Sequence, residues 1–102
     1  MGGDHAETWD AEILPAASRQ LRDLPNPERQ EALDILIDLA ENPFLPGAEQ
    51  LRGYNNPYKI RFGRGERYRV LYDVFPASRR VLIGAIKLRG PDTYSGMDKW
   101  RS

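Results

Sequence analysis

The stretch YKIRFGRGERYRVLY, Tyr58 to Tyr72, decides the fold of this 102-residue chain. Apolar residues occupy every second position on both sides of a glycine-containing centre, and cationic residues occupy positions between them. Because strand side chains alternate between two faces, this pattern is typical of a half-buried strand on each side. The stretch therefore predicts a β-hairpin, with strands over Tyr58–Phe62 and Arg67–Val74 and a turn over Gly63–Glu66.

The segments on either side of the hairpin continue the pattern. Pro76–Arg79 reads as a second turn, and the dense apolar run Val81–Leu88 as a third strand, closed by Gly90 and Pro91. Before the hairpin, Phe44–Pro57 reads as a loop with turn-forming residues. The C-terminal half thus predicts three strands joined by short connections, which is an antiparallel meander.

The N-terminal half predicts one strand and two helices. Trp9, Ala11 and Ile13 alternate with acidic residues, as in a strand. Apolar residues at helical spacing predict a short helix over Pro15–Leu24. A second helix follows, with Asn26 as its N-cap and Pro27 as its first residue, and it ends at Asn42 and Pro43. Its expected buried face is Leu33, Leu36, Ile37 and Ala40, widened by Ile35 and Leu39.

These elements predict an α+β domain of two layers: an N-terminal strand, a two-helix hairpin and the three-stranded antiparallel meander. Both helices are expected to cover one face of the sheet and to leave the other partly open. The length suits a single domain over residues 1–102, in which the polar residues 1–7 form a flexible leader.

Composition excludes several classes of function. The chain has no cysteine, which excludes disulfides, thiol nucleophiles and thiolate metal sites. It has one histidine and no cluster of potential ligands around it, so we expect neither a metal site nor a cofactor. No apolar run approaches the roughly 20 residues that a membrane-spanning helix needs, and no secretory signal is visible. We therefore expect no membrane association.

The formal net charge of +0 conceals a division along the chain. Residues 1–57 hold 4 Lys/Arg and 11 Asp/Glu, a net of −7, whereas residues 58–102 hold 11 Lys/Arg and 4 Asp/Glu, a net of +7. Such asymmetry indicates a surface that binds a polyanion. Chance segregation, or pairing of the two halves with each other, explains the same numbers.

Strand alternation places the cations of the hairpin on one sheet face. If the aromatic and aliphatic residues point to the core, Lys59, Arg61, Arg67 and Arg69 share the opposite face, and Lys87 and Arg89 border it. Arginine offers a planar fork of donors to phosphate oxygens, and lysine a compact charge. The pattern therefore favours phosphate recognition, although an ordinary solvated sheet face has the same composition. Arg64 lies in the turn and joins the candidate phosphate contacts.

Several motifs occur together in one order: LAENP (Leu39–Pro43), QLRG (Gln50–Gly53), YKIRFGRGERYRVLYDV (Tyr58–Val74), and then Lys87, Arg89 and Tyr94. In this order the chain resembles the RelE/ParE superfamily of bacterial toxins, most closely its RelE-like members. The resemblance covers Thr8 to Tyr94 and implies the RelE-like two-layer fold.

RelE-like members cleave mRNA in the ribosomal A site, and the resemblance implies this activity here. It assigns catalytic roles to Lys59, Arg61, Arg69, Arg89 and Tyr94, of which the Arg89 register is the loosest. Lys59 or Tyr94 would assist deprotonation of the ribose 2′-hydroxyl, and the arginines would stabilise charge on the phosphate. Arg67, Lys87 and Arg64 would contact RNA, and no metal would be needed.

The resemblance also implies the cellular setting and two alternative functions. The protein would act in the cytoplasm and would be held inactive by a cognate antitoxin, in a toxin–antitoxin hetero-oligomer. ParE-like members instead inhibit DNA gyrase without nuclease activity, which is one alternative. The other is a catalytically weakened member that works in a toxin–antitoxin repressor complex, since the chain is less basic than is usual in the family.

Overall fold

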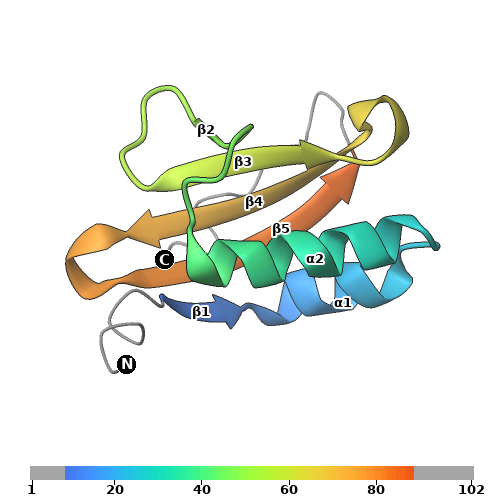
Figure 1. The fold of residues 1–102 in the computed structure, drawn as a ribbon, viewed down its shortest axis with the longest axis horizontal. Coiled ribbons are helices and arrows are strands. Elements are labelled where there is room, and N and C mark those ends of the chain that lie inside the picture. The colour runs from blue at the N-terminus through green and yellow to red at the C-terminus, as the bar shows by residue number, and fades with distance from the viewer. Residues whose placement is uncertain (1–8, 89–102) are drawn as a thin grey trace.

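The computed structural model describes residues 9–88 and shows two helices against one twisted sheet (Figure 1). The elements are β1 (Asp10–Ile13), α1 (Pro15–Asp23), α2 (Glu28–Glu41), β2 (Glu49–Gln50), β3 (Pro57–Phe62), β4 (Tyr68–Phe75) and β5 (Arg80–Leu88), with short 3₁₀ turns η2 (Arg64–Glu66) and η3 (Pro76–Ser78). The predicted α+β class and the three strands of the meander are confirmed. The leader over residues 1–7 and the closing pair Gly90–Pro91 lie outside the described residues.

The sheet is larger than the predicted meander. Within residues 9–88 its strand order is β1-β5-β4-β3-β2, with β1 parallel to β5 and the other pairs antiparallel, so the described part is a mixed sheet of five strands. The segment predicted as a loop contains β2, whose Glu49 lies opposite Lys59 of β3. Two residues are too short to show an alternating pattern, which is why the sequence did not reveal this strand.

The core lies between the sheet and the helices, on the face predicted from alternation. Cross-strand neighbours Tyr58–Tyr72, Ile60–Val70 and Phe62–Tyr68 point to this side of β3 and β4. Ile83 and Ile86 continue the same layer on β5. The predicted core assignment of the hairpin is therefore confirmed.

The buried stripe of α2 differs from the predicted one. Ala32, Leu36 and Leu39 are buried, whereas Leu33 and Ile37 are exposed. The apolar residues of this helix surround more than half its circumference, so periodicity alone did not determine which of them face the sheet. The start of the helix differs as well: Pro27 takes the N-cap position, Glu28 is the first helical residue, and no side chain caps the end.

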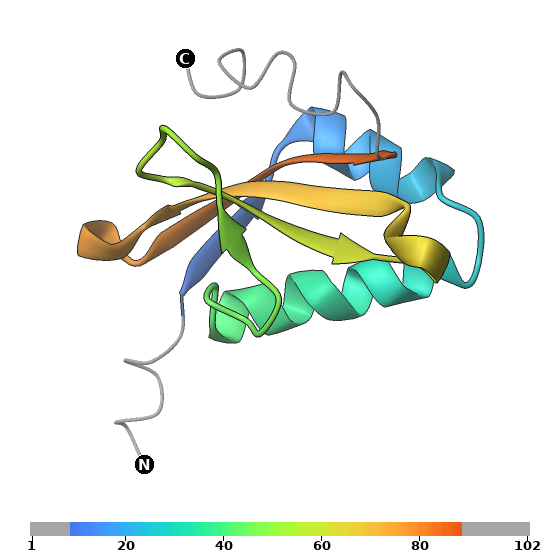
Figure 2. The same ribbon diagram turned by 90° about the horizontal axis from the view of Figure 1, so that it is seen from above.

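Of the two helices within residues 9–88, α2 alone lies across the sheet face, which corrects the prediction that both helices do. Figure 2 shows α2 on one side of the sheet and α1 beside β5, where α1 continues along the edge of the sheet from the end of β1. The N–H of Leu14 donates to the carbonyl of Ile83, and beyond that point the Gln20 side chain accepts from the N–H of Ile86 at 2.7 Å. Helix α1 thus covers the edge of β5 that β1 leaves unpaired.

The face opposite α2 carries Lys59 and Arg61 of β3 and Arg69 of β4. Leu71, Asp73 and Ala85 of this face are nonetheless buried, so the face is open only in part. Among residues 9–88, no helix is long and apolar enough to cross a bilayer.

Replacing Tyr72 with phenylalanine should lower the free energy of unfolding and should reduce the decrease of that free energy at alkaline pH. The Tyr72 hydroxyl is fully buried and donates to the Pro43 carbonyl at 2.8 Å, so its loss should cost about 1–3 kcal/mol. Burial, and to a lesser degree Tyr58, raises the pKa of Tyr72 well above its usual value near 10. The unfolded chain therefore releases this proton first, and stability falls as pH rises above about 10.

Urea denaturation of both proteins at neutral pH and in steps up to about pH 11 measures the two effects. An alkaline decline as steep in the Tyr72→Phe variant as in the parent would show that another group controls it.

Candidate functional site

Three cations form a row across the sheet on the face opposite α2. Arg61 of β3 lies opposite Arg69 of β4, and Arg69 lies opposite Lys87 of β5. Like charges directly opposite one another on a sheet destabilise it. Such a row is favourable when negative charge lies against it, and Glu49 and Glu66 supply part of that charge beside Arg61.

The position of Lys87 in this row depends on an irregularity in β5. Leu71 pairs with Ala85 and Tyr72 with Ile83, so Gly84 has no partner across the strand. Simple alternation from Val81 and Ile83 would place Lys87 on the core face. The extra residue reverses the alternation, and Ile86 then joins the core while Lys87 joins the cations.

Lys59 and Arg61 of β3 share one carboxylate. Glu49 Oε1 of β2 lies 3.5 Å from Lys59 Nζ and 3.3 Å from Arg61 Nη2. A second carboxylate, Glu66 Oε1 in η2, lies 3.7 Å from Arg61 Nη1. Because these side chains are partly exposed, we expect each pair to contribute little to stability. Both β3 cations lie within 3.5 Å of the same carboxylate oxygen.

Arg69 is held differently from its neighbours in the row. Its side chain is only 6% exposed, and Nη1 donates to the backbone carbonyls of Glu66 and Tyr68. Glu66 takes a positive φ of 55°, and Arg69 binds the carbonyl of this strained residue. Arg69 therefore anchors the β3–β4 turn and contributes positive charge from beneath the surface.

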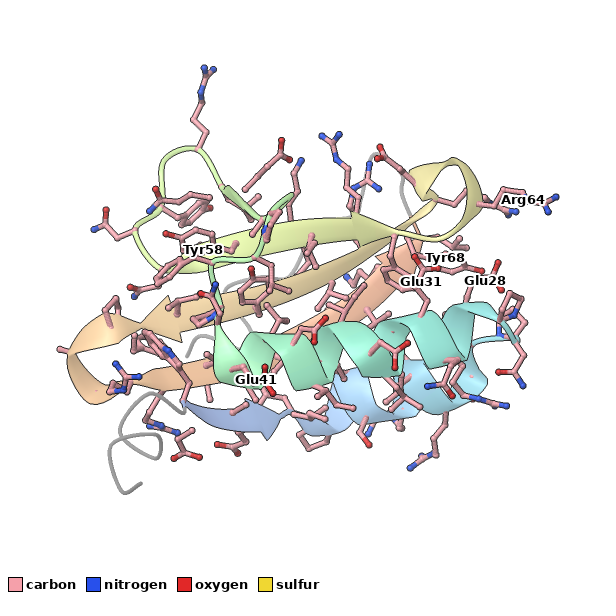
Figure 3. The ribbon with its side chains drawn as sticks, in the orientation of Figure 1. Glu28, Glu31, Glu41, Tyr58, Arg64 and Tyr68 are labelled. Carbon is pink, nitrogen blue, oxygen red and sulfur yellow. The ribbon has the colours of Figure 1, made fainter. Side chains whose placement is uncertain are left out.

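Two predicted RNA-contact residues lie away from this row. Arg67 precedes β4 and has an αR backbone conformation, so strand alternation does not apply to it, which corrects its predicted place on the sheet face. Arg64 is exposed in η2, and Figure 3 shows it projecting outward from the turn at the end of the sheet. The remaining predicted residues, Arg89 and Tyr94, lie outside the described residues.

The sequence reasoning missed Glu49. It lies in a segment predicted as a loop, and only the pairing of β2 with β3 brings it to Lys59. One signal was present: Glu49 is the only acidic residue in the interval 44–57, immediately before the QLRG motif. Within residues 9–88, His, Cys, Asp and Glu nowhere form a group of three that could hold a metal ion.

Comparison with solved structures identifies the architecture. The archaeal RelE–RelB complex from Pyrococcus horikoshii contains a chain similar to this one at a TM-score of 0.70 and 25% identity, over 82% of this chain and 98% of that one. A double mutant of the E. coli toxin RelE in the free state is similar at a TM-score of 0.74 and 23% identity, over 91% of this chain and 97% of that one. The RelBE2 toxin–antitoxin complex from Mycobacterium tuberculosis contains a chain that is similar at a TM-score of 0.65 and 24% identity, over 80% of this chain and 99% of that one.

The chain has the fold of the RelE toxin superfamily. No protein-family model matches its sequence, and no curated protein matches it significantly. The RelE-like fold is thus visible in the arrangement of the elements, while the sequence identity to these neighbours is low. The three similarities cover 97–99% of each neighbour and 80–91% of this chain, so each extends over nearly the whole neighbouring chain.

Proposed function

We propose that the protein is the toxin of a toxin–antitoxin pair and that it cleaves mRNA on the ribosome. One observation carries the proposal: Lys59 and Arg61 lie side by side on β3, next to the row formed with Arg69 and Lys87. A partly exposed group of cations on a sheet face suits the phosphodiester backbone of RNA. Solved structures that share the fold include RelE toxins bound to RelB antitoxins, which supports the same setting here.

The proposed reaction is an in-line attack by a ribose 2′-oxygen on the adjacent phosphorus. The new P–O bond forms as the bond to the 5′-oxygen of the next nucleotide breaks, which yields a 2′,3′-cyclic phosphate and a 5′-hydroxyl. Negative charge accumulates on the phosphorus oxygens in the transition state. Arg61 and Lys59 would stabilise that charge, with the field of the buried Arg69 behind them.

The reaction also needs a group that accepts the 2′-hydroxyl proton. Arginine stays protonated in proteins and cannot accept one. Glu49 is a carboxylate beside both β3 cations, so it would lie next to a phosphate bound there. We assign it the role of general base, in place of Lys59 or Tyr94. The proton for the leaving 5′-oxygen would come from Lys59 or from the C-terminal segment that contains Arg89 and Tyr94.

The proposed partner is an antitoxin that neutralises these cations. An acidic or amphipathic segment laid over β3 and β4 would replace the mRNA phosphates with carboxylates, as Glu49 and Glu66 already do locally. Such an antitoxin would block the site by occupying it, without any change in the fold.

Mapping of mRNA 5′ ends on translating ribosomes, with and without the purified protein, tests the proposal. We expect cuts at fixed positions within the codon in the A site, and intact mRNA when ribosomes are absent. A parallel assay follows DNA supercoiling by gyrase. Intact mRNA together with trapped gyrase–DNA complexes would show that the protein inhibits gyrase and does not cleave mRNA. Intact mRNA and unaffected gyrase would favour the remaining alternative, a protein that acts only within a toxin–antitoxin repressor complex.

A further inference from the structure

A groove of about 660 Å³ lies beside the two β3 cations, on the side of the β2–β3 connection. Its described lining comes from the β2–β3 hairpin: Glu49, Gln50, Leu51, Arg52, Tyr54, Lys59 and Arg61. The groove therefore combines an aromatic ring and a third cation with the residues proposed to bind the scissile phosphate. Neither the sequence motifs nor the proposed reaction assigns a role to Arg52 or Tyr54.

Backbone hydrogen bonds hold the loop that presents Tyr54. The Leu51 N–H donates to the Pro57 carbonyl at 2.9 Å, and the Tyr54 N–H donates to the Leu51 carbonyl at 3.2 Å. The Gln50 side chain donates to the Asn55 carbonyl at 2.7 Å. Leu51 is buried, which fixes the base of the loop. A ring on such a loop is positioned before any ligand arrives, so little ordering is needed on binding.

Tyr54 combines partial exposure with a cationic neighbourhood. It is 43% exposed, although a large apolar ring is usually more buried than this. Lys59 and Arg61 line the same groove, and Arg52 adjoins it on the loop. Single-stranded RNA has the complementary groups: flat bases that can stack on the ring, and between them negatively charged phosphates that can bind the cations.

We propose that this groove is a nucleobase subsite in which a base of single-stranded RNA stacks on the Tyr54 ring while its phosphate lies against Lys59 and Arg61. The proposal rests on the proposed function, which supplies the RNA, and adds the element that grips the substrate beside the reacting phosphate. Arg52 would neutralise the next phosphate along the strand. Stacking uses the face of any base, so the subsite tolerates all four and favours purines, which have the larger rings.

The test uses the full-length protein and a fluorescently labelled hexanucleotide with a 2′-O-methyl group on every ribose, which cannot be cleaved. Fluorescence anisotropy at low ionic strength measures its binding. We expect Tyr54→Ala to weaken binding about tenfold and Tyr54→Phe to keep it, because phenylalanine retains the ring. An abasic hexamer should bind the parent and the Tyr54→Ala variant equally. Ile37→Ala, on the exposed side of α2, is the control.

The outcomes separate this proposal from the proposed function. If the hexanucleotide binds the parent and the Tyr54→Ala variant equally, the subsite is excluded, and cuts in the ribosome assay would still support the nuclease. If the Tyr54→Phe variant binds the hexanucleotide as weakly as the Tyr54→Ala variant, the hydroxyl rather than the ring accounts for binding, and the proposed stacking subsite is excluded. If the parent neither binds the hexanucleotide nor cuts mRNA on ribosomes, both proposals fail together.

Discussion

Replacing Lys59 and Arg61 together with alanine should reduce mRNA cleavage on the ribosome by about a thousandfold or more. Removal of one preorganised group that stabilises transition-state charge typically costs about a hundredfold to a thousandfold. Both side chains project from β3 on the face away from the core, and their ion pairs with Glu49 are partly exposed. The fold should therefore remain, with a change in the free energy of unfolding of about 1 kcal/mol or less.

The rate of appearance of codon-positioned mRNA ends measures this effect, and urea denaturation verifies the fold. Arg80→Ala is a matched control, because Arg80 also forms a partly exposed ion pair, with Glu12 at 3.3 Å, on the strand pair at the other edge of the sheet. Its cleavage rate should equal that of the parent. A double variant that is folded and still cleaves at the parent rate would exclude the β3 cations from the reaction.

Replacing Glu49 with glutamine should slow cleavage about a hundredfold to ten-thousandfold while strengthening RNA binding. A positioned general base typically contributes a rate factor of about that size. Glutamine keeps the shape of glutamate but cannot accept a proton at neutral pH. It also removes the negative charge 3.3 Å from Arg61, and that charge would repel a phosphate. The two effects have opposite signs, which a purely structural role of Glu49 would not produce.

Single-turnover cleavage on ribosomes measures the rate, and anisotropy with the uncleavable hexanucleotide measures the affinity. The matched control is Glu12→Gln, since Glu12 pairs with Arg80 away from the site. A Glu49→Gln variant that binds more tightly and cleaves as fast as the parent would show that Glu49 only competes with phosphate for the cations. Lys59 or Tyr94 would then have to supply the base.

Much of the fold is predictable from the sequence because the β3–β4 hairpin has a strict period of two. Of the apolar residues in that pattern, Ile60, Phe62, Val70 and Tyr72 are buried in the core, and Tyr58 and Tyr68 are partly buried against it. The helix patterns were less informative. The apolar residues of α2 extend around the helix, so the packing against β3 and β4, rather than periodicity, leaves Ile37 exposed and buries Leu39.

The candidate site was predictable only where it lies on regular strands. Lys59, Arg61 and Arg69 were placed on one face by alternation, and the strand register agrees with that placement. Arg67 was misplaced because the 3₁₀ turn delays the start of β4 to Tyr68. Glu49 and Tyr54 were missed because their positions depend on the short β2 strand and on the loop that follows it.

The sequence by itself determined the α+β class, the core face of the YKIRFGRGERYRVLY hairpin and the face that carries Lys59, Arg61 and Arg69. All of these follow from local periodicity, which needs no knowledge of distant residues. Only the tertiary structure placed α1 along the edge of β5, Glu49 against Lys59, and Lys87 in line with Arg61 and Arg69. Each of these depends on pairing between strands, and for Lys87 on the unpaired Gly84, where one extra residue moves every later side chain to the other face.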